Sequence, residues 1–90
     1  MKLPESITEV GEDIFGDCKT LRGVKLPEGV SRINKEAFYG CSILETINFP
    51  AKLTSVGDNA FRSCLSLELD NLPNSLLYVG REAFCDVPLK

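Results

Sequence analysis

The fold is decided by residues 27–49, which read PEGVSRINKEAFYGCSILETINF. The proline of this stretch recurs every 23 residues, and most of the apolar positions recur with it. The recurring columns are Pro4, Pro27, Pro50 and Pro73; Val10, Ile33, Val56 and Val79; Gly11, Asn34, Gly57 and Gly80; Ile14, Ala37, Ala60 and Ala83; Phe15, Phe38, Phe61 and Phe84; Cys18, Cys41, Cys64 and Val87; Leu21, Leu44 and Leu67; and Leu26, Phe49 and Leu72. A repeat of this length is typical of a solenoid, in which neighbouring coils stabilise one another.

We therefore predict an α/β repeat solenoid with a single domain over residues 1–90. The predicted repeats span about 4–26, 27–49, 50–72 and an incomplete 73–90. Within a coil, Ile7–Val10 is expected to form a short strand and Leu21–Leu26 a second one, and Asp58–Cys64 marks the expected short helical turn. The Gly or Asn column predicts a positive φ, because both residues tolerate a left-handed backbone. Acidic residues after it, such as Glu12 and Asp13, suit the positive end of a helix.

The pattern Pro-x-x-Val-x-x-Ile-Gly-x-x-Ala-Phe-x-x-Cys-x-x-Leu-x-x-Ile-x-Ile resembles the BspA-like (treponemal-type) leucine-rich repeat, and residues 27–49 match it almost throughout. The resemblance covers about residues 1–89. It implies a right-handed, curved array with strands on the concave face and short helical turns on the convex side. Characterised relatives are mostly surface proteins of bacteria and parasitic protists that are implicated in adhesion to host proteins. The family has no common enzymatic activity, and its motif of framework positions assigns no binding residue.

The repeat becomes irregular in the last third of the chain. Asp70 stands where Val24 and Ile47 place an inward aliphatic side chain, so we expect local distortion, because an unpaired buried carboxylate is costly. Val87 replaces the cysteine of its column, and Cys85 stands two positions earlier. Neither end of the stack carries a polar cap, which solenoids normally need for solubility. Either the chain is a fragment or its uncapped ends pair with another chain, and the second alternative predicts a homo-oligomer.

Composition narrows the possible partners and locations. The 90 residues carry a net charge of −3 and no histidine, so we expect no nucleic-acid partner, which would need a basic face. No apolar run approaches the roughly 18 residues of a membrane helix, so no membrane insertion is expected. Met1–Glu5 does not resemble a signal peptide. This predicts a cytoplasmic location if the chain is complete, and a cell-surface or secreted one if it is a fragment of a larger adhesin.

The residue types present do not predict an enzyme, a cofactor or a metal site. Nucleophilic catalysis needs a base beside the nucleophile, and no histidine is available for that role. Without a histidine or a Cys-x-x-Cys pair, zinc is not expected. The column of Cys18, Cys41 and Cys64 is predicted to be a core ladder, because a buried free cysteine behaves as a small apolar residue. Cys85 is predicted to face solvent as a candidate reactive thiol.

The surface that varies between coils is the expected place for function. The candidate partner-binding residues are Arg22, Lys25, Tyr39, Glu45, Asn48, Glu68, Leu69, Leu77 and Tyr78. Leu77 and Tyr78 are apolar where their counterparts are polar, which favours a protein partner, although the same two residues could simply cover the C-terminal end of the stack.

Three functions remain open from the sequence. The first is a non-enzymatic protein-binding scaffold, with adhesion as the role that the resemblance implies. The second is a small intracellular inhibitor or adaptor, for instance one encoded by a phage or mobile element, that binds a host protein complex. The third is a structural unit of a homo-oligomer.

Overall fold

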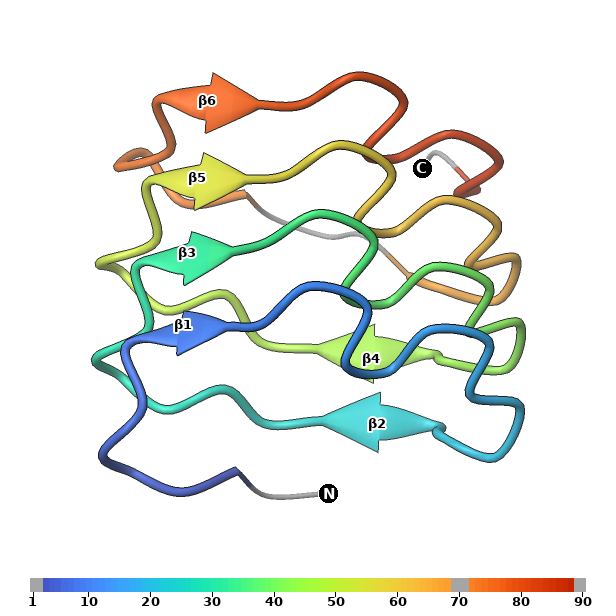
Figure 1. Cartoon of the computed structure of the whole chain (residues 1–90), viewed down its shortest axis with the longest axis horizontal. Coiled ribbons are helices and arrows are strands. Elements are labelled where there is room, and N and C mark those ends of the chain that lie inside the picture. The colour runs from blue at the N-terminus through green and yellow to red at the C-terminus, as the bar shows by residue number, and fades with distance from the viewer. Residues whose placement is uncertain (1–2, 69–71, 89–90) are drawn as a thin grey trace.

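The computed structural model describes residues 3–68 and 72–88. The chain winds into coils that stack on one another, with short strands on two sides of the stack (Figure 1). One side carries β1 (Glu9–Val10), β3 (Arg32–Ile33), β5 (Ser55–Val56) and β6 (Tyr78–Val79), and the other carries β2 (Gly23–Val24) and β4 (Thr46–Ile47).

The described strands pair in parallel, in the orders β1-β3-β5-β6 and β2-β4. Every pairing joins residues that are 23 positions apart, such as Glu9 with Arg32 and Gly23 with Thr46. A constant offset means that each strand lies beside its own counterpart in the next coil. The predicted repeat solenoid is therefore confirmed, whereas its hand and its concave side stay predictions of the resemblance.

A column of phenylalanine rings runs through the core of the stack. Adjacent rings are stacked, with centroids 5.2 Å apart for Phe15 and Phe38, 5.1 Å for Phe38 and Phe61, and 5.4 Å for Phe61 and Phe84. Neighbouring strands of a sheet lie roughly 4.7–4.9 Å apart, so the rise from coil to coil sets this spacing. The two middle rings are fully buried and the two outer rings half-buried.

The segment after the first strand of each coil is a chain of turns, and the prediction of a helical turn at Asp58–Cys64 is wrong. No helix occurs in residues 3–68 and 72–88. The amide of Ala60 donates to the carbonyl of Gly57 at 3.2 Å, as in a β-turn, but the next amide, that of Phe61, donates to Ala83 in the following coil at 2.7 Å. Because alternate amides bond between coils, the i to i−4 ladder of an α-helix cannot form.

The left-handed residues lie two positions later than predicted. None of the residues in the Gly or Asn column has a positive φ. Positive φ is found at Asp13 (57°), Glu36 (59°), Asn59 (59°) and Glu82 (57°), and again at Asp17 (56°), Gly40 (74°), Ser63 (65°) and Asp86 (66°). A positive φ at the third residue of a turn is the mark of a type II turn. Since short Asp and Asn side chains tolerate this conformation, the acidic residues here suit turns, not a helix terminus.

The Gly or Asn column instead allows adjacent coils to approach closely. A Cβ added at Gly57 would lie 2.6 Å from the backbone nitrogen of Lys35, and one at Gly80 would lie 2.4 Å from that of Asp58. At Gly11, in the coil of β1, a Cβ would meet nothing within 4 Å. Gly57 and Gly80 therefore lie where a Cβ would collide with the preceding coil, whereas Asn34, whose amide donates to Val10 of the preceding coil, carries a Cβ at the equivalent position.

Several residues of the predicted core columns are exposed. Ile14 is 57% exposed, Leu72 40% and Val79 47%, whereas Ala37 and Val56, from two of the same columns, are fully buried. These predictions were wrong for positions in outer coils, although Val10 and Ala83, which also lie in outer coils, are only 2% exposed. Asp70, where distortion was predicted, lies outside the described residues.

Candidate functional site

A hollow of about 570 Å³ lies over β2 and β4. Its lining residues come from these strands and from the turn after β2: Val24, Lys25, Glu28, Thr46, Ile47 and Asn48. Val24 is buried and Ile47 half-buried, while Lys25, Glu28 and Thr46 are exposed. Within the described residues, neither Lys25 nor Glu28 has an ion-pair partner. The hollow therefore offers an apolar surface beside one unpaired cation and one unpaired carboxylate.

A column of charged residues precedes the strands of this side. Arg22 Nη1 lies 3.8 Å from Glu45 Oε2, and both side chains are more than half exposed. The amide of Glu68 donates to the carbonyl of Glu45 at 3.0 Å, so Glu68 occupies the same place in the next coil. The column thus holds one cation, Arg22, which lies near Glu45, and a second carboxylate, Glu68, in the next coil. An exposed pair of this kind adds about 0–1 kcal/mol to stability, so its charges remain available to a partner.

Asn48 is exposed, as predicted, but its amide group bonds within the chain. Its Oδ1 accepts a hydrogen bond from the amide of Leu26 at 2.7 Å, and its Nδ2 donates to the carbonyl of Leu26 at 3.0 Å. The side chain thereby links two coils where the backbone ladder of β2 and β4 ends. Asn48 is consequently a structural element of this face more than a free polar group for a partner.

The apolar and aromatic candidate residues lie in different parts of the described chain. Leu77 is 86% exposed and directly precedes β6, an edge strand of the four-stranded sheet, and Tyr78 is 54% exposed within β6. Tyr39 is half-buried and lines a different hollow, of about 330 Å³, with Asp13, Asp17 and Glu36. Leu69 lies outside the described residues. The structure therefore separates Tyr39 from Leu77 and Tyr78.

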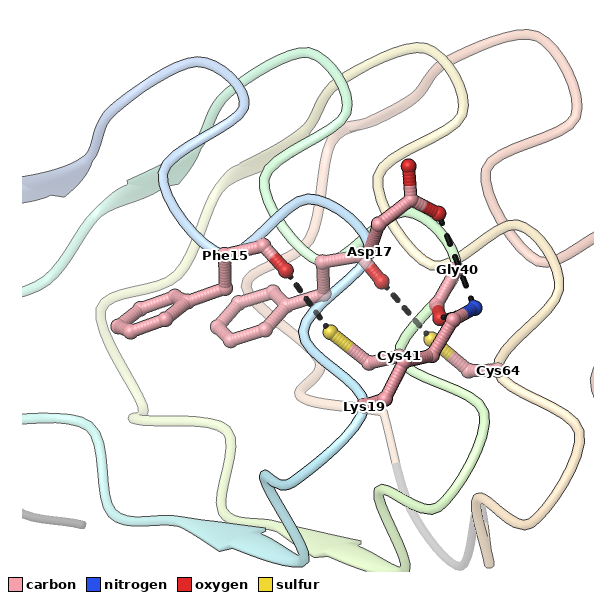
Figure 2. A network of polar contacts seen from close by, with 7 residues as sticks. Phe15, Asp17, Lys19, Gly40, Cys41 and Cys64 are labelled. Atoms are coloured by element: carbon pink, nitrogen blue, oxygen red, sulfur yellow. Dashed lines mark hydrogen bonds and ion pairs between the residues drawn. The ribbon is translucent and has the colours of Figure 1, made fainter.

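The cysteine column lies in the core and forms hydrogen bonds between coils (Figure 2). The thiols of Cys41 and Cys64 are fully buried and donate to the carbonyls of Phe15 and Phe38, each at 3.1 Å. Burial raises the pKa of Cys41 to about 11 and that of Cys64 to about 12. Both thiols therefore stay protonated at neutral pH and are poor nucleophiles. The predicted core ladder is present, with a donor role that an apolar side chain could not supply.

The outer cysteines differ from the two buried ones. Cys18 is half-buried, with its Sγ 3.8 Å from Thr20 Oγ1. Cys85, which we expected to face solvent, is also only half-buried, and its carbonyl accepts the amide of Ser63 at 2.9 Å. All four cysteines are free thiols.

Among the described residues, no cluster of three or more His, Cys, Asp or Glu side chains is arranged to hold a metal ion. The part of the chain that the structure describes contains no helix of the length and apolarity needed to cross a bilayer.

Sequence reasoning missed three residues that line the hollow over β2 and β4, namely Val24, Glu28 and Ile47. Val24 and Ile47 belong to an apolar column, which predicted burial and not a place beside a surface hollow. Glu28 follows Pro27 in a turn, and only the winding of the coil brings that turn beside β2. Lys25 and Glu28 are close in the sequence and separated by Leu26 and Pro27, which could have suggested that their side chains border the same surface.

The short strands pair in parallel with a constant offset of 23 residues, and chains of turns connect them. This architecture is that of a leucine-rich-repeat solenoid. The profile described as BspA type leucine rich repeat region (6 copies) matches residues 1–90. The chain therefore belongs to the BspA-type leucine-rich-repeat family. Proteins of this family are typically binding scaffolds without enzymatic activity.

Solved structures of bacterial leucine-rich-repeat proteins are similar to this one. A protein from T. pallidum shares 29% identity and a TM-score of 0.78, over 96% of this chain and 53% of that one. A protein from Bacteroides capillosus ATCC 29799 shares 25% identity and a TM-score of 0.84, over 96% of this chain and 68% of that one. The chain thus spans about half the length of the T. pallidum protein. No curated protein matches the sequence.

Proposed function

We propose that this chain is a non-enzymatic scaffold that binds a partner protein through the face of β2 and β4. The observation that carries this proposal is the hollow of about 570 Å³ over the two strands, with Lys25 and Glu28 unpaired at its edge. Protein interfaces combine an apolar centre with a polar rim. Ile47 supplies apolar surface, and the column of Arg22, Glu45 and Glu68 adds charges of both signs beside it.

The charge pattern of this face favours a partner that presents both signs of charge. Charges at the rim of an interface mainly set specificity and the rate of association, and they contribute less to affinity. The partner should therefore place a carboxylate near Lys25 and a cation near Glu45 and Glu68. Asn48 supports this surface by joining two coils through Leu26.

For the biological role we propose adhesion, on the strength of the family's surface-exposed relatives. In that role the partner is an extracellular host protein, and the chain acts at the cell surface or after secretion. The second candidate is a small intracellular inhibitor or adaptor. The two roles place the partner in different compartments, which makes them separable by experiment.

The test uses the immobilised chain and two sets of probes: purified extracellular-matrix proteins and a cytoplasmic extract of the source cell. Binding is measured by surface plasmon resonance, with mass spectrometry for the extract. Saturable binding of a matrix protein supports adhesion, and saturable binding of a cytoplasmic protein supports the inhibitor or adaptor role. The absence of saturable binding to every probe would contradict a protein-binding function.

A pair of matched variants locates the binding face. Lys25→Glu combined with Glu68→Lys reverses two charges of the face and keeps the net charge. Lys52→Glu combined with Glu5→Lys does the same at two exposed turn residues outside the hollow. We expect the first variant to weaken binding about tenfold or more, because several rim charges act together, and the second to bind like the wild type. Equal affinities of the two variants would exclude this face.

A further inference from the structure

The charged groups on the face of β2 and β4 follow one another along the direction of the strands. Arg22, Glu45 and Glu68 form a column that precedes the strands and holds one positive and two negative charges. Lys25 directly follows β2, and Glu28 lies in the turn after it. Along the strands, the charge of this face therefore changes from net negative to positive and back to negative.

The three charged positions are about equally spaced. Lys25 lies three residues beyond Arg22, whose carbonyl accepts the amide of Glu45 at 2.7 Å. A strand rises roughly 3.3 Å per residue, so Lys25 is about 10 Å along the strands from the charged column. Glu28 follows three residues further on. The stretch up to Pro27 stays extended, because the residue before a proline avoids the helical conformation, so this second interval is similar to the first.

The charges of Lys25, Glu28 and Glu68 are free for a partner. All three side chains are exposed, and none has an ion-pair partner among the described residues. The neighbour of Lys25 in the next coil is Asn48, which is uncharged and is held by two hydrogen bonds to Leu26. Unpaired charges of alternating sign select a partner whose charges alternate in the complementary order.

The spacing of the charges determines which backbone conformation of a partner fits. A polyproline II segment has three residues per turn and a rise of about 3.1 Å, so every third side chain lies on one side, at intervals of about 9 Å. In a β-strand, third neighbours point to opposite faces. A helix spans the same distance in about seven residues, but helices bind grooves through several apolar anchors. Among the described residues that line the hollow, Val24 is buried and only Ile47 offers apolar surface, so the face fits a polyproline II segment best.

We propose that the partner presents a polyproline II segment with a basic, an acidic and a second basic side chain at every third position. The first basic side chain lies near Glu45 and Glu68, the acidic one near Lys25, and the second basic one near Glu28. An apolar side chain between them contacts Ile47. This order of charges reads the same in both directions along the segment. The inference rests on the proposed function, since it uses the same face, and adds the sign and spacing of the partner's charges.

Fluorescence anisotropy with the full chain tests the proposal at low ionic strength, where exposed charges are least screened. The first probe is a labelled synthetic peptide with lysine, aspartate and lysine at every third position and with proline and leucine between them. The second has the same composition, with the aspartate at one end and both lysines on the same side of it. We expect the first peptide to bind about tenfold more tightly, because several charges are matched at once. Equal affinities would overturn the proposal.

A third peptide distinguishes a helical partner from an extended one. It places the same three charges seven residues apart in an alanine-rich sequence that forms a helix, and it should bind more weakly than the first peptide. Tighter binding of this peptide would overturn the polyproline II conformation. If none of the three peptides binds at near-millimolar concentration, the inference is wrong, whereas the proposed function is decided separately by the protein probes and by the charge reversals at Lys25 and Glu68.

A charge reversal at Glu28 tests the order of the charges. Glu28→Lys should reverse the preference of the chain, so that a peptide with aspartate in place of one terminal lysine binds about threefold more tightly than the first peptide. Glu12→Lys changes the net charge equally, at an exposed position outside the hollow, and should keep the preference of the wild type. An unchanged preference of the Glu28→Lys variant would overturn the proposed order.

Discussion

The coil of β5 and the coil of β6 follow the same repeat but differ in how deeply their side chains are buried. Val56 and Phe61 are fully buried, while the identical residues Val79 and Phe84 of the next coil are exposed and half-buried. The described chain places coils on both sides of β5 and on one side of β6. The deeper burial of Val56 and Phe61 therefore comes from the additional coil beside β5, and the stability of a stack depends mainly on contacts between coils.

The largest expected difference between the two coils concerns the ring column. Phe61→Ala removes a ring that is stacked on both sides and contacted edge-on by Phe49, and should lower the free energy of unfolding by about 3–5 kcal/mol. Phe84→Ala removes a half-buried ring that stacks on Phe61 alone among the described residues and should cost clearly less. Urea unfolding followed by circular dichroism measures both values. Equal losses would show that the coil of β6 is as well packed as that of β5.

The next effect is a loss of stability at high pH, which separates the buried thiols from the outer ones. Burial raises the pKa of Cys41 to about 11 and that of Cys64 to about 12, above the ordinary value of 9.0. Above pH 9 the unfolded chain loses these two thiol protons more readily than the folded protein does. The contribution of the buried thiols to the free energy of unfolding is therefore fully present below pH 9 and is lost as the pH rises towards and through the two folded-state values. With about 1.4 kcal/mol for each pKa unit, the free energy of unfolding should fall by about 2 kcal/mol between pH 8 and pH 10.

Serine variants identify the thiols that cause this loss. The double variant Cys41→Ser with Cys64→Ser should lose most of the pH dependence in urea unfolding, because a serine hydroxyl does not titrate in this range. Cys85→Ser, at a half-buried position, is the matched control and should keep it. If Cys85→Ser removed the dependence and the double variant did not, the assignment to the buried column would be wrong.

A smaller effect is expected from glycines at equivalent positions. Gly57→Ala places a Cβ 2.6 Å from the Lys35 nitrogen and should cost about 1–3 kcal/mol through the shift of backbone that it forces. Gly11→Ala meets nothing within 4 Å and should be neutral or stabilising by about 0.4–1 kcal/mol, because alanine restricts the unfolded chain. Thermal unfolding of the two variants compares them. A destabilised Gly11→Ala variant would contradict the steric origin of this column.

The smallest expected effect concerns the second residue with a positive φ in the turns of each coil, the position that Gly40 and Ser63 occupy. Ser63 has φ 65°, and its counterpart in the preceding coil is Gly40, with φ 74°. Ser63→Gly should raise the free energy of unfolding by about 1 kcal/mol, because glycine has no Cβ to penalise this conformation. Gly40→Ala should have the opposite effect. Differential scanning calorimetry would detect both shifts, and a destabilised Ser63→Gly variant would contradict the left-handed conformation.

The candidate site was only partly accessible to sequence reasoning. Arg22, Lys25, Glu45 and Glu68 were predicted as surface charges, and the structure describes them on the side of β2 and β4. The internal hydrogen bonds of Asn48 could not be predicted, because they depend on the distance between its side chain and Leu26 of the preceding coil. The place of Tyr39 beside Asp13, Asp17 and Glu36 could not be predicted for the same reason, since these neighbours come from adjacent coils.

The sequence by itself determined the 23-residue period and the columns of phenylalanine and cysteine. Only the tertiary structure decided where φ is positive, at which glycines a Cβ would collide with the preceding coil, and which members of a column are buried. The physical reason is that a period defines which residues are equivalent, whereas hydrogen-bond partners and burial depend on the coil that lies next to each residue. Val56 and Val79 are therefore identical in the sequence and different in the folded protein.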